Sequence, residues 1–278
     1  VWLAFFYRAF DKGKKECYVM EAKNAVDVKN LDFSYGDRKV LEEICARFHP
    51  GMVCGLLGPN GSGKTTLLKN IAAILKPQKN TVYINGTDIT DMTANELARE
   101  ISVVPQNTYI EFDFSVQDIV MMGRAPYIKR FSSESEEDIE TAQWAMRIAG
   151  IEDLAERSIK NISGGELQRV IIARALAQRS NIILLDEPVS QLDIYHQLSI
   201  METVRTLAYE YGMTVVTVLH DLNLAAEFCD YIYLLKDGVI AYSGKPKDVL
   251  TYEIIEEVYK IVCLVYENPA SKKPHIVP

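Results

Sequence analysis

A glycine-rich segment supplies the first residues in this sequence that could do chemistry. It is the run Gly58-Pro59-Asn60-Gly61-Ser62-Gly63-Lys64-Thr65-Thr66. Its first eight residues fit the pattern G-x-x-x-x-G-K-[ST], in which backbone N–H groups and the start of the next helix surround phosphate oxygens. Lys64 is expected to reach the β- and γ-phosphates of a nucleotide, and the Thr65 hydroxyl is expected to bind Mg²⁺. The segment therefore predicts nucleotide binding, and a glycine-rich turn that binds nothing is the weaker alternative.

Two adjacent acids follow an apolar run further along the chain. Residues 182–185 are Ile, Ile, Leu and Leu, and Asp186 and Glu187 come next. A buried strand would carry Asp186 to its end, where the carboxylate can hold Mg²⁺, and Glu187 would activate or orient the attacking water. Because phosphoryl transfer depends mostly on positioning and charge stabilisation, this pair suits the hydrolysis of ATP. The alternative is a buried strand that ends in exposed acids before Pro188.

Strands and helices that alternate along the chain are expected to position these residues. Apolar runs of strand length occur at 25–35, 40–48, 52–57, 81–84, 101–104, 182–186, 213–219, 231–236 and 239–243. Helical spacing and N-cap residues predict helices over 65–75, from 116, from about 132 to 150, over 165–177 and 195–211, and from 221. This alternation predicts an α/β fold. We expect a P-loop core with a mostly parallel sheet, an antiparallel β N-terminal subdomain, and a helical subdomain inserted at about 105–165.

Length and charge limit the possible classes of protein. The 278 residues suffice for one large domain with small appendages. We expect a disordered or non-native extension at 1–22, the main domain at 23–262 and a tail at 263–278, so truncation to Met20 is expected to leave ATPase activity intact. The net charge of −8 disfavours a general nucleic-acid binder. The five scattered cysteines indicate a reducing compartment, and no apolar run approaches the ~20 residues of a membrane-spanning helix.

A serine and two glycines begin the helix that precedes Asp186. The segment is Ile162-Ser163-Gly164-Gly165-Glu166-Leu167-Gln168-Arg169. Exposed N–H groups, a hydroxyl and the helix dipole make such a start an anion site. The segment resembles the Leu-Ser-Gly-Gly-Gln signature of the ATPase subunits of ABC transporters, from which it departs mildly at Ile162 and Glu166. The resemblance implies that two copies pair head to tail, each offering residues 163–166 to the ATP of the other.

Four smaller features occur in the order that this family uses, and their roles follow from the resemblance. Tyr35 matches the aromatic residue that stacks on adenine. Gln106 matches the glutamine that senses Mg²⁺ and water and joins the core to the helical insertion. Residues 190–193 match the loop that crosses to the other subunit, with Gln191 as a departure. His220 matches the switch histidine that contacts the γ-phosphate, while His49, His196 and His275 are interpreted as structural residues.

The resemblance narrows to one subfamily. Stretches similar to importers of iron–siderophore, haem and cobalamin are Met122–Tyr127, Glu166 within the signature, His220–Ala225, Tyr259 and 267–275. Tyr127 stands where these importers usually have His. The resemblance implies a peripheral motor at the cytoplasmic face of the membrane, with two permease subunits and, indirectly, an extracytoplasmic binding protein. The most favoured cargo is an iron(III)–siderophore, and cobalamin or haem is the alternative. A soluble ABC-type ATPase that acts on nucleic acid or ribosomes, and a P-loop kinase, are the other classes considered.

Overall fold

Three fully buried strands form the centre of the molecule. The computed structural model describes residues 24–129 and 132–278, so the extension expected at 1–22 lies outside the described residues. Every residue is buried in β3 (Val53–Leu57), β7 (Ile182–Asp186) and β8 (Thr214–Val218). Strands buried on both faces belong to the interior of a parallel sheet with helices on each side. These three strands pair in parallel, as the α/β prediction requires.

The main sheet has six strands in the order β10-β9-β3-β8-β7-β6. Its outer members are β6 (Ile101–Val104), β9 (Tyr231–Lys236) and β10 (Val239–Gly244), and only β10 runs antiparallel to its neighbour. A second, antiparallel sheet has the order β2-β1-β4-β5. It contains β1 (Val26–Tyr35), β2 (Arg38–Phe48), β4 (Val82–Ile84) and β5 (Thr87–Asp88). The expected antiparallel N-terminal subdomain is confirmed.

The two faces of the main sheet belong to two hydrophobic cores, because successive side chains of a strand point to opposite sides. Leu184 and Val216 face the core that contains α1 (Lys64–Ile71) and the antiparallel sheet. Leu185 and Val215 face the other core. Most of the remaining helices pack there, including α6 (Ile194–Tyr209) and α7 (Leu222–Phe228). The sheet therefore separates the phosphate-loop helix from most of the helical layer.

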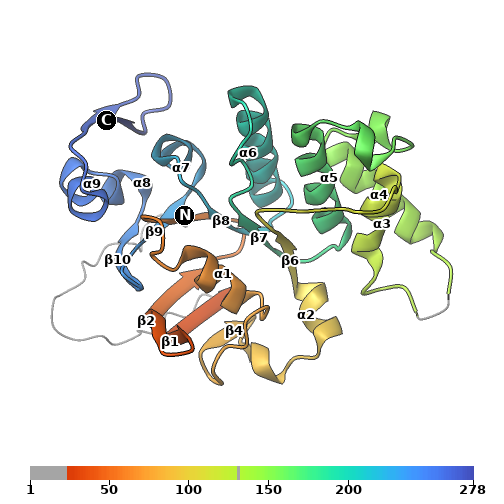
Figure 1. The fold of residues 1–278 in the computed structure, drawn as a ribbon, viewed down its shortest axis with the longest axis horizontal. Helices are drawn as coiled ribbons and strands as arrows, with labels where there is room; N and C mark the ends of the chain where they lie inside the picture. Colours follow the sequence, from red (N-terminus) through yellow and green to blue (C-terminus); the bar gives the residue numbers. More distant parts are fainter. Residues whose placement is uncertain (1–23, 130–131) are drawn as a thin grey trace.

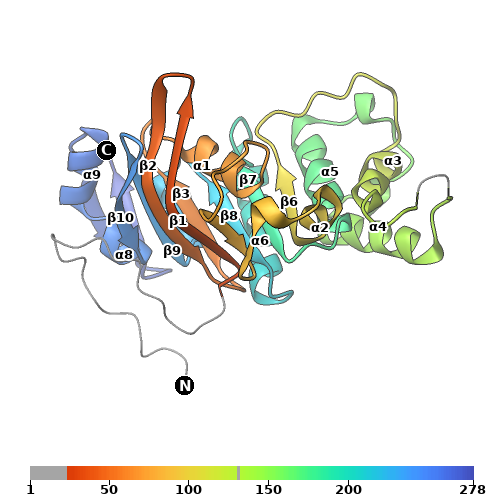
Figure 2. The same cartoon turned by 90° about the horizontal axis from the view of Figure 1, so that it is seen from below.

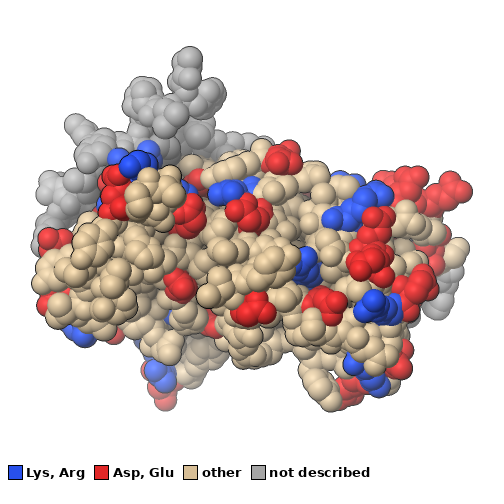
Figure 3. Space-filling view, turned by 90° about the horizontal axis from the view of Figure 1, so that it is seen from above, with Lys and Arg blue, Asp and Glu red and all other residues tan. Residues whose placement is uncertain are grey.

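Three helices stand together at one end of the molecule, on the right in Figures 1 and 2. They are α3 (Val116–Met121), α4 (Glu136–Ile148) and α5 (Gly164–Ala177), which pack on one another. We call residues 107–129 and 132–177 the helical group. It continues past the expected boundary at residue 165, because α5 packs on α3 and α4. Acids begin α4, and acidic side chains gather at this end of the molecule in Figure 3.

Short elements connect these layers. They are α2 (Ala94–Glu100), α8 (Pro246–Val249), and the 3-10 helices η1 (Ile89–Asp91), η2 (Met122–Arg124), η3 (Glu152–Leu154) and η4 (Ile159–Asn161). The predicted helix 65–75 ends earlier than expected, at Ile71, because Ala73 adopts a left-handed conformation with φ of 51°. Within the described ranges, no helix is long and apolar enough to cross a bilayer.

The C-terminal segment is an ordered part of the fold rather than a simple tail. It comprises α9 (Tyr252–Tyr259) and a hairpin of β11 (Leu264–Glu267) with β12 (Pro274–Val277). Ile276 is buried, and its backbone exchanges two hydrogen bonds with the side-chain amide of Asn223 in α7. These contacts attach the hairpin to the domain.

Candidate nucleotide site

The glycine-rich loop joins the buried strand β3 to the start of α1. Gly58 has φ of 140°, and a Cβ there would lie 2.1 Å from the carbonyl oxygen of Leu235. Gly63, the N-cap of α1, has φ of 103°, and its Cβ would lie 2.6 Å from Cδ2 of Leu41. Both positions therefore require glycine, since other residues would be strained and would clash. At these two positions the loop packs closely against β9 and β2.

Lys64 directly follows the loop, and its side chain turns back towards the start of the loop. Its Nζ donates hydrogen bonds to the carbonyl oxygens of Gly58 (2.8 Å) and Pro59 (3.0 Å). The side chain is buried. Burial lowers the pKa of Lys64, and the nearby carboxylates of Glu187 and Asp186 oppose that effect. The ammonium is thus held within the space that the loop surrounds, where a phosphate would meet it.

Two side chains with oxygen donor atoms lie side by side where β7 ends. The Thr65 hydroxyl donates a 3.0 Å hydrogen bond to Oδ1 of Asp186. Burial raises the pKa of Asp186, whereas the hydrogen bond from Thr65 opposes the rise. A buried carboxylate beside a hydroxyl is the kind of all-oxygen donor set that suits Mg²⁺, which also takes ligands from water and substrate phosphates. The residues present fit the metal that the sequence predicts.

Three polar side chains converge just beyond the carboxyl ends of adjacent strands. Gln106 follows β6, Glu187 follows β7 and His220 follows β8. Nε2 of Gln106 donates to Oε2 of Glu187 at 2.7 Å, and Nε2 of His220 lies 2.6 Å from Oε1 of the same carboxylate. Both oxygens of Glu187 are therefore held, one by each neighbour. The carboxyl ends of parallel strands are where α/β proteins bind their ligands.

The backbone at Glu187 is unusual. Its φ is 53°, in the left-handed region that residues other than glycine seldom adopt. The turn that contains it is held by Ser190, whose backbone N–H and hydroxyl both donate to the carbonyl oxygen of Glu187. Such strain persists only where surrounding contacts enforce it, and it concentrates at functional sites. Together, the turn and the two side-chain contacts fix the Glu187 carboxylate.

The signature segment forms a capped helix start. The Ser163 hydroxyl accepts from the N–H of Glu166 at 3.3 Å, and the Glu166 carboxylate accepts from the N–H of Ser163 at 2.6 Å. This reciprocal pair is a capping box. The backbone N–H and the hydroxyl of Ser163, both directed at the Glu166 carboxylate, lower the pKa of Glu166. This segment holds Ser163, Gly164, Gly165 and Glu166 at the start of α5, and in both views α5 stands apart from α1, the helix that follows the phosphate loop.

Tyr35 lies at the end of β1, where the strand turns towards β2. Its ring is about half exposed and packs edge-on against Phe33, with 5.0 Å between the ring centroids. An exposed aromatic ring at a strand end can stack on a base. The structure therefore leaves the predicted adenine contact accessible.

Two residues that sequence reasoning did not assign to the site lie against it. His196, interpreted as structural, has its Nδ1 2.9 Å from Oδ2 of Asp193, and its ring would touch a Cβ at Gly165. The spacing of three between Asp193 and His196 was the available signal. Tyr259 lies beside the start of the phosphate loop. Burial raises the pKa of Tyr259 to about 12, and the backbone N–H of Gly58 opposes the rise. No local pattern links Tyr259 to the loop.

The fold and this site define a class, the P-loop ATPases. The model of the ABC transporter family matches residues 41–190. The iron(3+)-hydroxamate import ATP-binding protein of Bacillus subtilis is 36% identical over 90% of this chain and 93% of its own length. The hemin import ATP-binding protein of Gloeobacter violaceus is 42% identical over 87% of this chain and 89% of its own.

A solved structure agrees with these relatives. A metal-chelate type ABC transporter in an inward-facing conformation superposes with a TM-score of 0.80 at 29% identity, covering 92% of this chain and 97% of that one. This chain belongs to the ABC transporter family. It is the ATP-binding and ATP-hydrolysing type of subunit of that family.

Proposed function

We propose that this chain is the ATP-hydrolysing motor subunit of an importer for a metal chelate. The contact of Gln106 and His220 with opposite oxygens of Glu187 carries the hydrolytic part of the proposal. The likeness to import ATP-binding proteins over nine-tenths of the chain supports the transport part. The favoured cargo is an iron(III)–siderophore, since the first relative above imports an iron(3+)-hydroxamate. Haem is the second candidate, supported by the hemin import relative, and cobalamin remains an alternative.

The residues divide the work of hydrolysis between them. Residues 58–66 surround the phosphates with backbone N–H groups, and Lys64 contributes its ammonium to the β- and γ-phosphates. Mg²⁺ would be held by Thr65 and Asp186, with Gln106 near it, and would neutralise charge on the phosphate oxygens. Glu187 orients the attacking water and takes up its proton. His220 holds the Glu187 carboxylate and contacts the γ-phosphate, and Tyr35 stacks on adenine.

A second copy completes the site. Ser163 begins α5 in the helical group, apart from the phosphate loop of its own chain. The free N–H groups and dipole at this helix start suit an anion from another molecule. We place residues 163–166 of each copy against the γ-phosphate of the ATP held by the other. Binding of two nucleotides then favours a closed dimer, and hydrolysis reopens it.

The membrane partners are two permease subunits, and this chain sits against them as a peripheral protein at the cytoplasmic face. Tyr109 and Phe112, in the segment after Gln106, expose 86% and 69% of their surface, as expected of residues that meet a partner. Closure of the ATPase dimer would move the permease pair. A binding protein on the other side of the membrane delivers the cargo.

Uptake measurements test this proposal directly. Cells that carry this subunit with its permease are expected to accumulate a ferric hydroxamate, and Glu187→Gln is expected to abolish that uptake. The same cells are given hemin and cobalamin in parallel, and uptake of one of these alone would replace the favoured cargo. ATPase activity that rises with DNA or ribosomes, without co-purification of two hydrophobic membrane proteins, would contradict a role in transport.

A further inference from the structure

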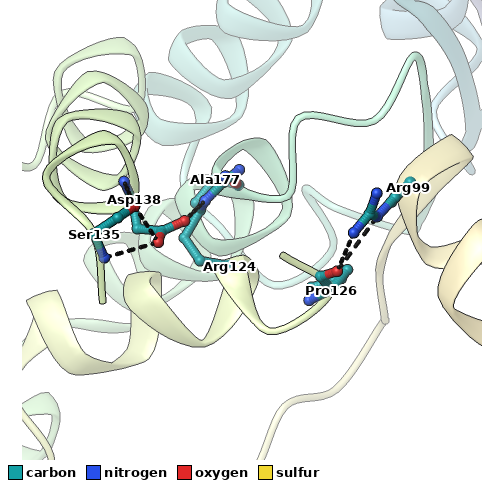
Figure 4. Close-up of polar contacts among 6 residues, drawn as sticks. All are labelled: Arg99, Arg124, Pro126, Ser135, Asp138 and Ala177. Carbon is teal, nitrogen blue, oxygen red and sulfur yellow. Dashed lines mark hydrogen bonds and ion pairs between the residues drawn. The ribbon is translucent and has the colours of Figure 1, made fainter. Parts of the chain in front are cut away.

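The stretch Gly123–Tyr127 has no place in the nucleotide site, although the sequence singles it out. It includes the last two residues of η2 and lies at the edge of the helical group, next to α2 (Figure 4). Gly123 is packed so closely that a Cβ would lie 2.1 Å from the carbonyl oxygen of Arg174 in α5. The stretch is therefore fixed against the C-terminal half of α5.

Arg124 anchors this stretch inside the helical group. It is 3% exposed, its Nε donates to Oδ1 of Asp138 at 2.9 Å, and one terminal nitrogen donates to the carbonyl oxygen of Ala177 at 2.8 Å. Asp138 belongs to the first turn of α4, where it also accepts from Ser135, and Ala177 is the last residue of α5. The Ser135 hydroxyl and the Arg124 guanidinium together hold the pKa of Asp138 below its usual range. Arg124 thus connects the start of α4 to the end of α5.

The ring of Tyr127 contacts two guanidinium groups, one from the core and one from the helical group. Cζ of Arg124 is 4.0 Å from the centre of the Tyr127 ring, and Cζ of Arg99 is 4.8 Å from it. Arg99 belongs to α2, on the core side, and donates two hydrogen bonds to the carbonyl oxygen of Pro126, at 2.9 and 3.3 Å. The side chain of Asn95, also in α2, donates to the same oxygen at 3.0 Å. A cation over an aromatic face is attracted by the electrons of the ring.

A groove of about 460 Å³, open to solvent, lies between α2 and the C-terminal half of α5, at the boundary between the core and the helical group, which we call the seam. Leu97, Met122 and Arg174 are among the residues that line it. Gln178, just after α5, spans the seam by donating to the carbonyl oxygens of Ala98 and Ile101. The groove is open to solvent, and the polar contacts beside it help to set the angle between α2 and α5.

We propose that Tyr127, through its cation–π contact with Arg99, is a positioning residue for Ser163. The clamp made by Asn95, Arg99, Pro126 and Tyr127 holds the C-terminal end of α5 against the core. Ser163 begins the same helix at its opposite end. Fourteen residues of helix span about 21 Å, so a tilt of ~10° at the clamped end would move Ser163 by ~4 Å. This proposal rests on the proposed dimer, in which Ser163 meets the ATP of the partner copy.

Variants at exposed Arg99 and at partly buried Tyr127 test the clamp without emptying a core. Arg99→Ala removes both hydrogen bonds to Pro126 and one cation from the ring, and Tyr127→Leu removes the ring. Each is expected to lower kcat at least fivefold in the full chain, while the affinity of the monomer for a fluorescent ATP analogue stays within twofold. Tyr127→Phe keeps the ring and is expected to restore near-normal kcat. Arg147→Ala, at an exposed ion pair with Glu152 in the same group, is the matched control and is expected to change neither quantity.

The possible outcomes distinguish a failure of the clamp proposal from a failure of the proposed dimer on which it depends. If Ser163→Arg blocks turnover but Arg99→Ala and Tyr127→Leu do not, the clamp is wrong and the composite site stands. If Ser163→Arg leaves turnover intact, the composite site is itself wrong. If Tyr127→Phe fails like Tyr127→Leu, the contact between ring and cations is not the cause. Equal thermal midpoints for the variants and the control are expected, and a fall in midpoint that parallels kcat would reduce Tyr127 to a structural residue.

Discussion

His220 and Glu187 meet through Nε2 and Oε1 at 2.6 Å, although they are 33 positions apart in the chain. The other oxygen of Glu187 accepts from Gln106. The carboxylate is thus held from two sides. Preorganised polar groups of this kind are a main source of enzymatic rate acceleration, because they need not reorganise during the reaction.

Glu187→Gln is expected to abolish turnover and keep ATP binding. The amide has nearly the same shape but cannot take a proton from water, so kcat is expected to fall at least ~100-fold. Phosphate release measures turnover, and equilibrium binding of a fluorescent ATP analogue measures affinity, which is expected to change less than about threefold. The bound ATP is also expected to trap a dimer, visible by light scattering. Near-normal phosphate release from this variant would remove Glu187 from the role proposed here.

Ser163→Arg tests the second copy. The added guanidinium would stand where the helix start of one chain meets the ATP of the other, and the N-cap hydroxyl would be lost. Binding of ATP to dilute, monomeric protein is expected to stay normal, because α5, which Ser163 caps, stands apart from α1 and the phosphate loop of its own chain. Hydrolysis at high protein concentration is expected to fall more than ~10-fold, as expected when a catalytic contact is lost. Lost binding by the monomer would place Ser163 in its own site and contradict the head-to-tail arrangement.

Asp186→Asn is expected to separate stability from function. Burial raises the pKa of Asp186, so the charged form is disfavoured in the folded chain. Because the folded pKa lies above the unfolded value of 3.8, the folding free energy becomes less favourable as pH rises through this interval. At neutral pH the neutral amide is therefore expected to leave the thermal midpoint equal or higher. Mg²⁺-dependent hydrolysis is expected to fall at least ~100-fold, because one oxygen ligand loses its charge.

The Asp186 experiment has a matched comparison. Thr65→Val removes the other proposed ligand and also the hydroxyl that donates to Asp186. It is expected to lose Mg²⁺-dependent activity in the same way, but without a gain in thermal midpoint. A normal dependence of hydrolysis on Mg²⁺ in either variant would contradict the metal assignment.

Glu166 makes the start of α5 sensitive to acid. Hydrogen bonds from Ser163 lower the pKa of Glu166 below 4.5, so its stabilising contribution is complete above pH 4.5 and is lost as pH falls through the folded pKa. Glu166→Gln keeps an oxygen acceptor for the N–H of Ser163 but has no charge. Wild type is expected to exceed this variant in stability at pH 7 by about 0.3–1 kcal/mol, the usual value of a charge at a helix N-terminus. Urea unfolding at pH 7 and pH 4 measures the difference, which is expected to shrink in acid; a constant difference would contradict the assignment.

The sequence by itself determined the features that depend on neighbouring residues. The phosphate loop follows from residue types at fixed spacing, and the helix starts at Ser115 and Ser163 follow from capping residues three positions before an acid. The apolar run that ends at Asp186 likewise predicts a buried strand, and β7 has those bounds. Local chemistry is enough in each case, because the interacting groups are a few residues apart.

The tertiary structure decided what depends on distant segments. Gln106 and Glu187 are 81 residues apart, and only the parallel order of β8, β7 and β6 places their side chains in contact with each other and Glu187 in contact with His220. The end of α1 at Ile71 and the packing of the C-terminal hairpin on α7 also escaped prediction, as did the contacts of Tyr127 with Arg99 and Arg124. These features arise from long-range pairing and close packing. A single sequence carries no local signal for such contacts, because the contacting residues are far apart in the chain and meet only when the layers pack together.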